Sequence, residues 1–498
     1  MTQSATASKA PEHQDRRSDG HRCWLRSPRL VYSDGLDPRD AAGGLVVADG
    51  RIVELLRAEQ QPDQPVDEVR SMEGLVLVPG LINTHHHCYQ TLTRAFRSAL
   101  DKPLFPWLQA LYPLWAGLTD DMVESATELA LLELLQSGAT TVVDHHYVVG
   151  SRVREPIDRQ IEVARRLGVR VVLTRGSMSL GERDGGLPPD WIVQSAEEIL
   201  DDSARLLRAY HDPADAAMVQ IALAPCSPFS VTRELLEATA TLAAQHRVLL
   251  HTHLAETLDE EAFCLEHHGV RPLAFLEQCG WLNERAWFAH GIHFTDDEIA
   301  ALGAAGAAVS HCPTSNMMLS SGLCRVADLE AAGAPVSLGV DGSASNDGSN
   351  LMQEVRQAFL LQRLRLAEVN RLRLAEVNRL RFAEVSSPAV SETATLPSHL
   401  DALRWATRGG AETLRRPALG HLGVGACADI ACFDLDELRF SGADDPLAAL
   451  VLCGAHRARH VMINGQWRLW QGEVAGVDIA QVQAKHEALA AELRRTLG

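Results

Sequence analysis

The sequence predicts a closed parallel (β/α)8 barrel, the TIM-barrel fold, flanked by a small β-sandwich built from both chain ends. Between residues 76 and 340, eight short apolar runs alternate with segments whose apolar residues recur at helical spacing. Polar residues gather at the C-terminal end of every apolar run, where such a barrel places its active site. A chain of 498 residues suits one large barrel plus a smaller domain. A doubly wound sheet or two smaller α/β domains would also have strands that alternate with helices, but the polar residues at the end of every strand favour the barrel.

The predicted strands are apolar on both faces, as expected of strands buried in a parallel barrel. They cover Val76–Asn83, Thr140–Asp144, Arg170–Thr174, Val219–Ala224, Val248–His251, Ala286–Ala289, Ala307–Ser310 and Pro335–Val340. The predicted helices between them include Asp120–Gln136, Arg154–Leu167, Ala196–Tyr210 and Arg233–Gln245. Each strand therefore ends in a loop that can carry a functional side chain.

Both ends of the chain carry short alternating segments with Gly and Asp turns, which are typical of strands and hairpins. We predict that residues 22–78 and 422–476 pair into one β-sandwich and that residues 79–421 form the barrel. Residues 1–21 are polar and are expected to be a disordered leader. Residues 477–498 are expected to form a C-terminal helix.

The composition excludes several classes of partner. The formal net charge of −19 argues against a nucleic-acid or anionic-membrane surface, because both need basic patches. No run of 18 or more uncharged apolar residues is present, so no membrane span is predicted. The N-terminus lacks the apolar core of a secretory signal, and ten cysteines without paired spacing fit a reducing compartment. We therefore expect a cytoplasmic protein whose partner is a small molecule.

Histidines crowd the end of the first predicted strand, in the run His85-His86-His87. Side chains alternate with a period of two along a strand, so His85 and His87 point together into the barrel mouth and His86 points elsewhere. Two imidazoles on one side form a chelate for zinc. His253, at the end of the fifth strand, offers a third nitrogen, and Asp341, after the eighth, offers an oxygen. A lone histidine is more often structural, but potential metal ligands at the ends of several strands predict a metal site.

Two further residues have the chemistry of a metal-dependent hydrolase. Glu256 lies three residues after His253, close enough to reach both a water molecule on the metal and a substrate that this water attacks. We therefore expect Glu256 to shuttle a proton between the water and the substrate. A solvated carboxylate at a helix start is the alternative interpretation of Glu256. His290 ends the sixth strand, where it can orient the water or polarise the substrate. Glu256, His290 and Asp341 are therefore the predicted catalytic residues.

Several motifs, in this order along the chain, resemble the amidohydrolase superfamily and its cytosine-deaminase-related branch, which includes s-triazine hydrolases. They are the run from Pro79 to His87, His253-Leu-Ala-Glu256, Ala289-His290, Ser310-His311-Cys-Pro-Thr-Ser-Asn316 and Leu338-Gly-Val-Asp341-Gly-Ser. The resemblance spans about residues 22 to 476. It implies a metal, usually zinc and sometimes iron, with Glu256 as proton shuttle and His290 beside the water. The implied ligands are His85, His87, His253 and Asp341.

The scarcity of lysine predicts one metal ion per chain. Lysine occurs only at Lys9, Lys102 and Lys485, whereas binuclear members of the superfamily bridge two metals with a carboxylated lysine on a barrel strand. The cytidine-deaminase fold also uses zinc, but it needs a Pro-Cys-x-x-Cys motif. Here Pro225-Cys226 is followed by Ser-Pro-Phe, so that fold is excluded.

Four more stretches are similar to bacterial 8-oxoguanine deaminases and to hydroxyatrazine (hydroxydechloroatrazine) ethylaminohydrolases. They run from His85 to Arg94, Leu104 to Trp115, Arg175 to Ser179 and Ala224 to Ser230. The resemblance implies hydrolytic deamination of a purine-like ring, with 8-oxoguanine giving urate and ammonia as the first choice. Hydroxyatrazine N-ethylaminohydrolase and guanine deaminase are the alternatives. A catalytically inactive metal-binding scaffold is the non-enzymatic alternative, and the presence of every ligand and of the glutamate argues against it.

A flat heterocycle needs a slot with a few fixed polar groups. We expect Gln90 and Arg175 to hydrogen-bond the ring, and Trp107 and Trp115 to wall the slot. Helix core is an equally good interpretation of the two tryptophans. Cys226 is expected to line the pocket, although a buried cysteine more often serves packing alone.

A local repeat follows the last predicted strand. The octad Arg363-Leu-Arg-Leu-Ala-Glu-Val-Asn recurs at residues 371–378 and nearly so at 379–386. A period of eight is not that of a coiled coil, so we expect a tandem duplication within one helix. A tolerated surface expansion is the simplest interpretation, and an oligomer contact is the alternative. The resemblance also implies a homo-oligomer, which is common among such relatives.

Overall fold

The computed structural model describes residues 20–382 and 396–496. Most of the leader predicted at residues 1–21 lies outside the described residues, and so does the end of the third octad.

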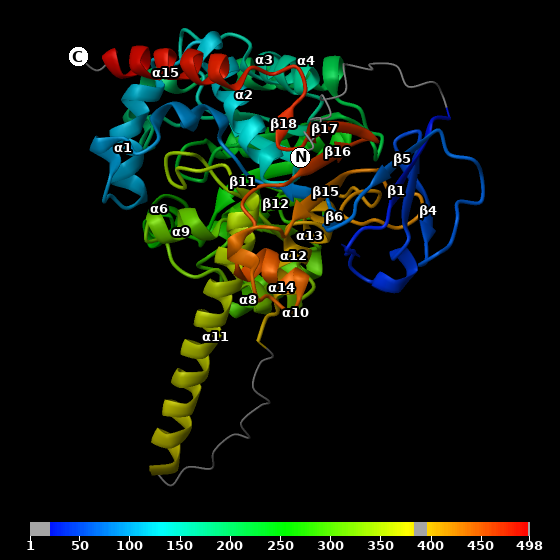
Figure 1. The fold of residues 1–498 in the computed structure, drawn as a ribbon. Coiled ribbons are helices and arrows are strands. Elements are labelled where there is room, and N and C mark those ends of the chain that lie inside the picture. Colours follow the sequence, from blue (N-terminus) through cyan, green and yellow to red (C-terminus); the bar gives the residue numbers. More distant parts are fainter. Residues whose placement is uncertain (1–19, 383–395, 497–498) are drawn as a thin grey trace.

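Eight parallel strands form the centre of the molecule, and their spatial order is their order in the chain. They are β7 (Leu81–Asn83), β8 (Ala139–His146), β9 (Arg170–Ser177), β10 (Val219–Pro225), β11 (Leu250–Leu254), β12 (Ala286–His290), β13 (Ala308–His311) and β14 (Val336–Leu338). Where β14 meets β7, the Thr84 amide donates to the Leu338 carbonyl at 3.0 Å. The predicted barrel is therefore confirmed (Figure 1).

Helices surround the barrel and bury their apolar faces against its strands. They include α2 (Asp120–Gln136), α3 (Pro156–Leu167), α4 (Ala196–Tyr210), α5 (Arg233–His246), α6 (Leu258–His268), α7 (Pro272–Gln278), α8 (Asp296–Ala305) and α10 (Val326–Ala331). Side-chain caps fix their starts: the Thr119 hydroxyl accepts from the Met122 amide at α2, and Ser195 forms a capping box with Glu198 at α4. The first four of these helices match the predicted ranges within two residues at each end.

The expected strand Val76–Asn83 is divided between two sheets. Its first part belongs to β6 (Leu75–Pro79) of a flanking sheet, and its last part is β7 of the barrel. Gly80 lies at the crossover, where a Cβ atom would come within 2.2 Å of the Thr140 hydroxyl. The apolar run does not reveal this division, because the residues on both sides of Gly80 are buried.

Two further sheets form the predicted β-sandwich beside the barrel (Figure 1). One has the order β4-β3-β1-β5, from β1 (Arg22–Arg26), β3 (Gly44–Ala48), β4 (Arg51–Leu56) and β5 (Glu68–Ser71). The other has the order β18-β17-β16-β15-β6-β2, from β2 (Leu30–Val31), β6, β15 (Ile430–Asp434), β16 (His460–Ile463), β17 (Gln466–Trp470) and β18 (Glu473–Val474). Leu25, Leu77 and Ile430 share one core between the sheets. Both chain ends therefore build the sandwich.

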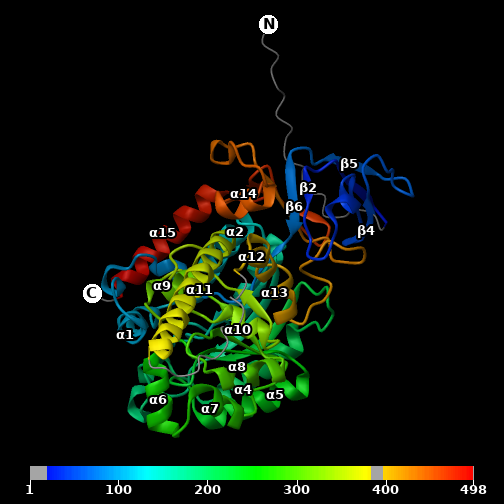
Figure 2. The same cartoon turned by 90° about the horizontal axis from the view of Figure 1, so that it is seen from below.

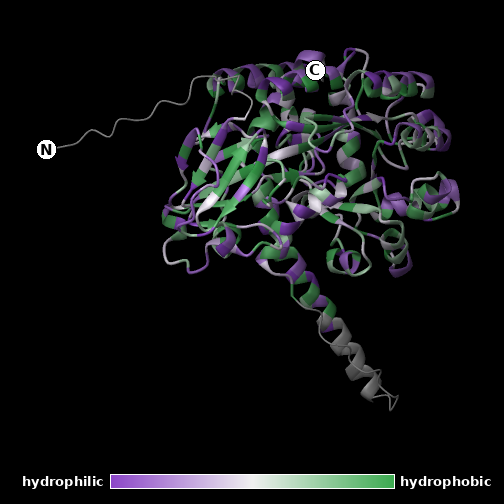
Figure 3. Cartoon of the chain, turned by 90° about the vertical axis from the view of Figure 1, so that its right-hand side faces the viewer, coloured by the Kyte–Doolittle hydropathy of each residue, from purple (hydrophilic) through white to green (hydrophobic). Residues whose placement is uncertain are grey.

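Four helices complete the regions that matter for the site. α1 (Leu104–Trp115) lies in the connection from β7 to α2, and α9 (Pro313–Met318) follows β13. α15 (Ile479–Arg495) lies along α2. α11 (Leu351–Phe382) contains the first two octads and runs out from the body of the molecule (Figures 1 and 3). Viewed from below, α11 lies in front of the barrel and the sandwich lies to one side (Figure 2).

Within residues 20–382 and 396–496, no helix combines the length and the apolar character that crossing a bilayer requires.

Candidate active site

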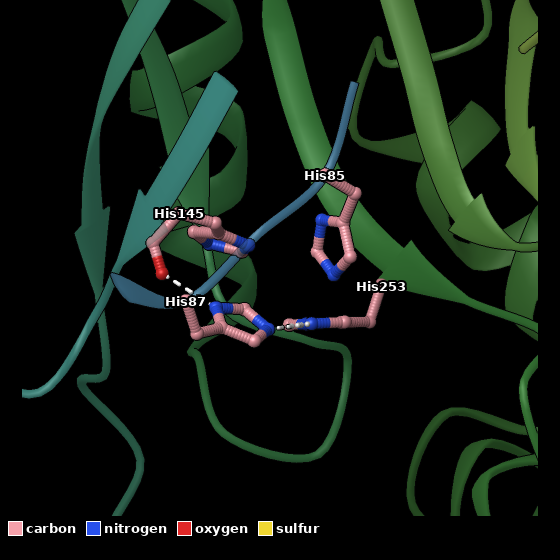
Figure 4. A group of neighbouring side chains, drawn as sticks. All are labelled: His85, His87, His145 and His253. Carbon is pink, nitrogen blue, oxygen red and sulfur yellow. Dashed lines mark hydrogen bonds between the residues drawn. The ribbon is translucent and has the colours of Figure 1, made fainter. Parts of the chain in front are cut away.

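Three histidines and an aspartate from different strand ends converge at the mouth of the barrel. The His87 Nε2 atom lies 3.1 Å from His253 Nε2. Asp341 Oδ1 lies 3.3 Å from His85 Nε2 and 3.2 Å from His87 Nε2. All four residues are buried. Figure 4 shows the three imidazole rings pointing toward one another, as the period of two along the strands predicts.

Hydrogen bonds behind the rings fix which nitrogen faces the centre. His87 Nδ1 donates to the His145 carbonyl at 2.7 Å, and His253 Nδ1 donates to the Cys226 carbonyl at 2.6 Å. A carbonyl oxygen can only accept, so each Nδ1 carries the ring proton and each Nε2 presents a lone pair.

The third ring is oriented by a histidine relay. His251 Nδ1 donates to the Trp287 carbonyl at 2.9 Å, which leaves His251 Nε2 as an acceptor. His85 Nδ1 lies 2.8 Å from His251 Nε2 and must therefore donate to it. His85 Nε2 accordingly presents a lone pair to the centre, like His87 Nε2. Burial lowers the pKa of His253 to about 3 and holds the pKa of His85 well below its usual value, so both rings are neutral.

This donor set fits a single tetrahedral cation. Four ligands at the usual zinc–nitrogen distance of about 2.0–2.1 Å are separated from one another by about 3.3–3.4 Å. The separation of His87 from His253 and those of Asp341 from His85 and His87, at 3.1–3.3 Å, are close to that value. Lone pairs that face one another and a carboxylate at these distances repel unless a cation lies between them.

Glu256 projects toward the same centre from the turn after β11. Its Oε2 atom lies 3.5 Å from His290 Nε2, and the Ser321 hydroxyl donates to its Oε1 atom at 3.4 Å. Burial raises the pKa of Glu256 above its usual value. The side chain is 3% exposed, which excludes the alternative of a solvated carboxylate at a helix start.

The turn that carries Glu256 is held by a second buried carboxylate, Glu260 of α6. The amides of Ala255 and Glu256 donate to the two Glu260 oxygens at 2.9 Å each. Ala255 has a φ of 53°, a left-handed conformation that a residue with a side chain adopts only when its surroundings enforce it. Burial raises the pKa of Glu260 to about 8. Glu260 is not among the residues predicted from the sequence. Its position at a helix start, four residues after Glu256, is the feature that could have indicated this role.

His290 is fixed by Asn316. No role was predicted for Asn316, although it ends the motif Ser310-His311-Cys-Pro-Thr-Ser-Asn316. His290 Nδ1 lies 2.9 Å from Asn316 Oδ1 and donates to it, and its Nε2 atom faces Glu256 and Asp341. Burial opposes protonation, but these two carboxylates raise the pKa of His290 overall. His290 and Asp341 both have left-handed φ angles, 73° and 61°. Backbone strain of this kind clusters at functional sites.

The other histidines of the cluster lie around the centre. His86 turns away: its Nδ1 atom accepts from the His87 amide at 2.7 Å, and its Nε2 atom lies 3.0 Å from the Ser349 hydroxyl. His145, which the sequence analysis left without a role, stacks on His253 with ring centres 4.9 Å apart. Its Nε2 atom donates to the Ala224 carbonyl at 2.8 Å. Figure 4 shows His145 beside the three rings.

A cavity opens onto this centre. Its lining includes the expected Gln90 and Cys226, together with Trp107. Its other lining residues are His87, Leu104, Leu108, Tyr112, Tyr147, Phe229, His253, Glu256, His290, Leu319, Asp341 and Ser345. Most of the residues that the sequence analysis did not assign come from α1 and from the loops over the mouth. Their position depends on how these segments fold back, which local periodicity does not predict.

Two predicted substrate contacts lie elsewhere. Trp115 is fully buried in a hydrophobic cluster, and its Nε1 donates to the Thr93 hydroxyl at 3.2 Å, so the helix-core interpretation holds. Arg175 lies near the end of β9, on the side that faces the outer helices, where it donates to Asp202 at 2.6 Å and to Gln194 at 2.9 Å. Along a strand, a position one residue out of phase with the lumen-facing side chains points outward. Arg175 is therefore not among the residues that line the cavity.

Comparison with known proteins places this arrangement in context. Residues 76–468 match the model of the amidohydrolase family. The chain is 54% identical over 473 residues to an 8-oxoguanine deaminase of Pseudomonas aeruginosa, covering 95% of this chain and 99% of that protein. It is 36% identical over 421 residues to a hydroxydechloroatrazine ethylaminohydrolase of Pseudomonas sp. (strain ADP), covering 82% and 81%. The crystal structure of atrazine chlorohydrolase from Arthrobacter aurescens TC1 complexed with zinc has a TM-score of 0.82 and 32% identity, covering 94% of this chain and 100% of that chain.

Proposed function

The chain belongs to the amidohydrolase family, and we propose that it deaminates a purine-like base, with 8-oxoguanine as its best substrate and urate and ammonia as products. It is a hydrolase of carbon–nitrogen bonds. The observation that carries the proposal is the convergence of three imidazole lone pairs, Asp341 and the buried Glu256 on one cavity. The high identity to an 8-oxoguanine deaminase over nearly the whole chain supports the choice of substrate.

We propose that His85, His87, His253 and Asp341 hold one Zn²⁺ ion, with Fe²⁺ as the alternative. Three neutral imidazoles and a carboxylate are donors that zinc prefers, and a structural neighbour is complexed with zinc. When bound, the ion supplies Lewis acidity, which lowers the pKa of a water molecule to about 7.

Glu256 is the proposed proton shuttle. Because burial raises its pKa, it can accept the proton that the attacking water loses and then release it. The water oxygen forms a bond to the ring carbon that carries the amino group, and a tetrahedral adduct results. Glu256 gives this proton to the ring nitrogen, takes the remaining proton of the new hydroxyl group and passes it to the amino group, so that the carbon–nitrogen bond breaks, ammonia leaves and the ring keeps an oxo group. His290, oriented by Asn316, faces Glu256 and Asp341 and can hold the water in line with the ring.

The chemistry of the cavity suits a flat, uncharged ring. Trp107, Leu108 and Phe229 offer apolar walls, while Gln90 and Tyr147 add neutral polar groups. Among the described residues that line it, none is Arg or Lys, so a phosphate group would find neither a guanidinium nor an ammonium partner there. A free base therefore fits this cavity better than a nucleotide does.

A panel of 8-oxoguanine, guanine, isocytosine and hydroxyatrazine tests the substrate. Release of ammonia or ethylamine, followed over a range of concentrations, gives kcat/KM for each compound. We expect the highest value for 8-oxoguanine. The 36% identical ethylaminohydrolase makes hydroxyatrazine the main alternative. A higher kcat/KM with hydroxyatrazine or guanine than with 8-oxoguanine would reassign the substrate.

We also propose that the enzyme is a cytoplasmic homo-oligomer. All ten cysteines lie in the described part of the chain, and none of them forms a disulfide there, which suits a reducing compartment. Leu360 and Leu364 of α11 are 42% and 57% exposed, which suits a contact between copies. Light scattering of the purified protein is expected to give a mass that is a multiple of 54.3 kDa, and a mass equal to one chain would contradict the proposal.

A further inference from the structure

One wall of the cavity is a single face of α1. Leu104, Trp107, Leu108 and Tyr112 line the cavity, and their spacing of three, one and four residues places them on one side of the helix. The Trp107 Nε1 is already committed to the Ala344 carbonyl at 3.1 Å, so Trp107 offers its ring to the cavity. Tyr112 therefore supplies the polar group of this wall.

The Tyr112 hydroxyl is fully buried and has no hydrogen-bond partner within the described part of the chain. Among the lining residues that the structure describes, it is the only one with a buried polar side-chain atom in this condition. Two neighbouring polar groups are engaged: Gln90 Oε1 accepts from the Ala344 amide at 3.3 Å, and the Ser345 hydroxyl contacts Asp341. Buried hydroxyl groups in proteins are nearly always hydrogen-bonded, and Tyr112 lines the cavity, so a group bound there can supply its partner.

The surroundings of this hydroxyl determine what it can bind. Burial, together with Cys226, Tyr89 and Glu256, keeps the pKa of Tyr112 well above its usual value, so the group stays a protonated donor. Burial likewise raises the pKa of the Cys226 thiol to about 12. A neutral donor on an apolar helix face suits a carbonyl oxygen on an uncharged ring.

We propose that Tyr112 is a substrate-binding residue whose hydroxyl donates a hydrogen bond to an oxo group of the bound ring. This inference rests on the proposed deaminase function and names the contact by which α1 recognises the substrate. The Tyr112 hydroxyl recognises the oxo group, and the rest of α1 provides a flat apolar wall for the ring. A ring that lacks an oxo group opposite Tyr112 should therefore bind less tightly.

The test is the variant Tyr112→Phe, which removes the hydroxyl and keeps the ring. Steady-state kcat and KM are measured with 8-oxoguanine and with isocytosine, which is the six-membered ring of the same base without the imidazolone. Tyr32→Phe is the matched control, because its hydroxyl contacts the Leu400 carbonyl far from the cavity. Melting temperatures of all three proteins establish that each is folded. Binding of urate by calorimetry adds a readout that does not depend on turnover.

We expect Tyr112→Phe to lower kcat/KM for 8-oxoguanine and to weaken urate binding by about tenfold, the effect of one lost hydrogen bond, while Tyr32→Phe matches the wild type. A loss with 8-oxoguanine alone assigns the contact to the imidazolone oxygen, and a loss with both compounds assigns it to the six-membered ring. Unchanged kinetics and urate binding in folded Tyr112→Phe would overturn the inference. If the wild type itself does not deaminate 8-oxoguanine, the proposed function fails instead.

Discussion

Hydrogen bonds behind the histidines give each ring its role at the centre. Carbonyl groups of His145 and Cys226 hold the protons of His87 and His253 on Nδ1, and His251 does the same for His85. Three nitrogens thereby present lone pairs to the centre, where we propose that the metal binds. Such partners tune both the orientation and the basicity of the ligands.

The His251 relay leads to a prediction about metal affinity. His251→Phe keeps a ring stacked on Trp287, where the two ring centres now lie 4.2 Å apart, but removes the acceptor for His85. His85 is then free to place its proton on Nε2, so the affinity for zinc should fall by about 10- to 100-fold. Competition with a chromophoric chelator measures it. Wild-type affinity in this variant would show that the relay does not orient His85.

Glu256→Gln tests the proton shuttle. The amide keeps the size of the side chain but cannot accept a proton, so kcat with 8-oxoguanine should fall by about 10²- to 10⁴-fold, the usual contribution of a positioned acid–base group. The metal content should not change, because Glu256 lies outside the four proposed ligands. Elemental analysis of the same preparation supplies that control, and a variant that turns over normally would remove Glu256 from the mechanism.

The period of two along strands explains why the orientation of the strand-end histidines could be predicted from the sequence. It places His85 and His87 together and turns His86 away, and the structure has this arrangement. The same rule, applied to β9, would have turned Arg175 outward. Its charge and its place at a strand end instead suggested the cavity, and Asp202 in α4 takes the guanidinium.

Among the elements, α11 connects the two loops that follow the last barrel strands. Glu354 in its first turn accepts from the Thr314 amide and hydroxyl at 3.0 and 2.6 Å, and from the Asn346 side chain at 3.0 Å. Thr314 belongs to α9, which also carries Asn316, and Asn346 belongs to the loop that carries Asp341. One buried carboxylate therefore holds α9 and this loop together beside the cavity.

Glu354 also makes stability depend on pH. Burial raises its pKa from 4.5 to about 7 in the folded protein. A carboxyl whose pKa is raised by folding favours the folded state most at low pH, and that contribution is lost as the pH rises from the unfolded pKa through the folded one. The contribution of Glu354 should therefore decline between about pH 4.5 and pH 7.

The variant Glu354→Gln isolates this effect. Its melting temperature should be lower than that of the wild type, because one acceptor oxygen is lost, but it should change less between pH 5 and pH 8. Glu277→Gln, at an exposed position of α7, serves as the control and should follow the wild type. The comparison uses metal-saturated protein at each pH. Parallel pH profiles for Glu354→Gln and the wild type would contradict the assignment.

The orientation of α1 is a feature that the sequence does not predict. Apolar spacing suggests a helix at Leu104–Trp115 but does not decide which of its tryptophans faces the cavity. In the structure Trp107 lines the cavity and Trp115 packs against Tyr89, with ring centres 5.2 Å apart. The choice depends on the angle at which α1 crosses the barrel mouth, which is set by tertiary packing.

At the scale of the whole molecule, a buried ion pair joins the barrel to the sandwich. Arg170 at the start of β9 is fully buried and donates twice to Asp429, at 3.0 and 3.1 Å, next to β15. Asp429 also accepts from the Asn464 amide at 2.7 Å. The carboxylate therefore connects the barrel to two parts of the flanking sheet.

Removal of this carboxylate should destabilise the whole protein. Asp429→Ala leaves the Arg170 guanidinium buried without its partner, which typically costs about 3–5 kcal/mol. Denaturant unfolding measures the loss. Asp436→Ala, at an exposed position seven residues away, should change stability by no more than about 0.5 kcal/mol. Equal stabilities of the two variants would mean that the ion pair does not hold the two parts together.

The architecture as a whole was largely predictable because eight apolar strands with polar ends leave few alternatives. The division of the first strand at Gly80 was not, since burial continues on both sides and only the close approach of Thr140 marks the crossover. Residues at strand ends were placed well by their register. Residues on α1 and in the loops were not, because long-range packing decides where they lie.

The central claim is that one metal ion, held by His85, His87, His253 and Asp341, makes this protein a deaminase. The most direct test is a titration of chelator-treated enzyme with Zn²⁺ while ammonia release from 8-oxoguanine is measured. Activity should be absent without metal, rise linearly with added zinc and level off at one ion per chain. Undiminished activity after metal removal, or a break at two ions per chain, would contradict the claim.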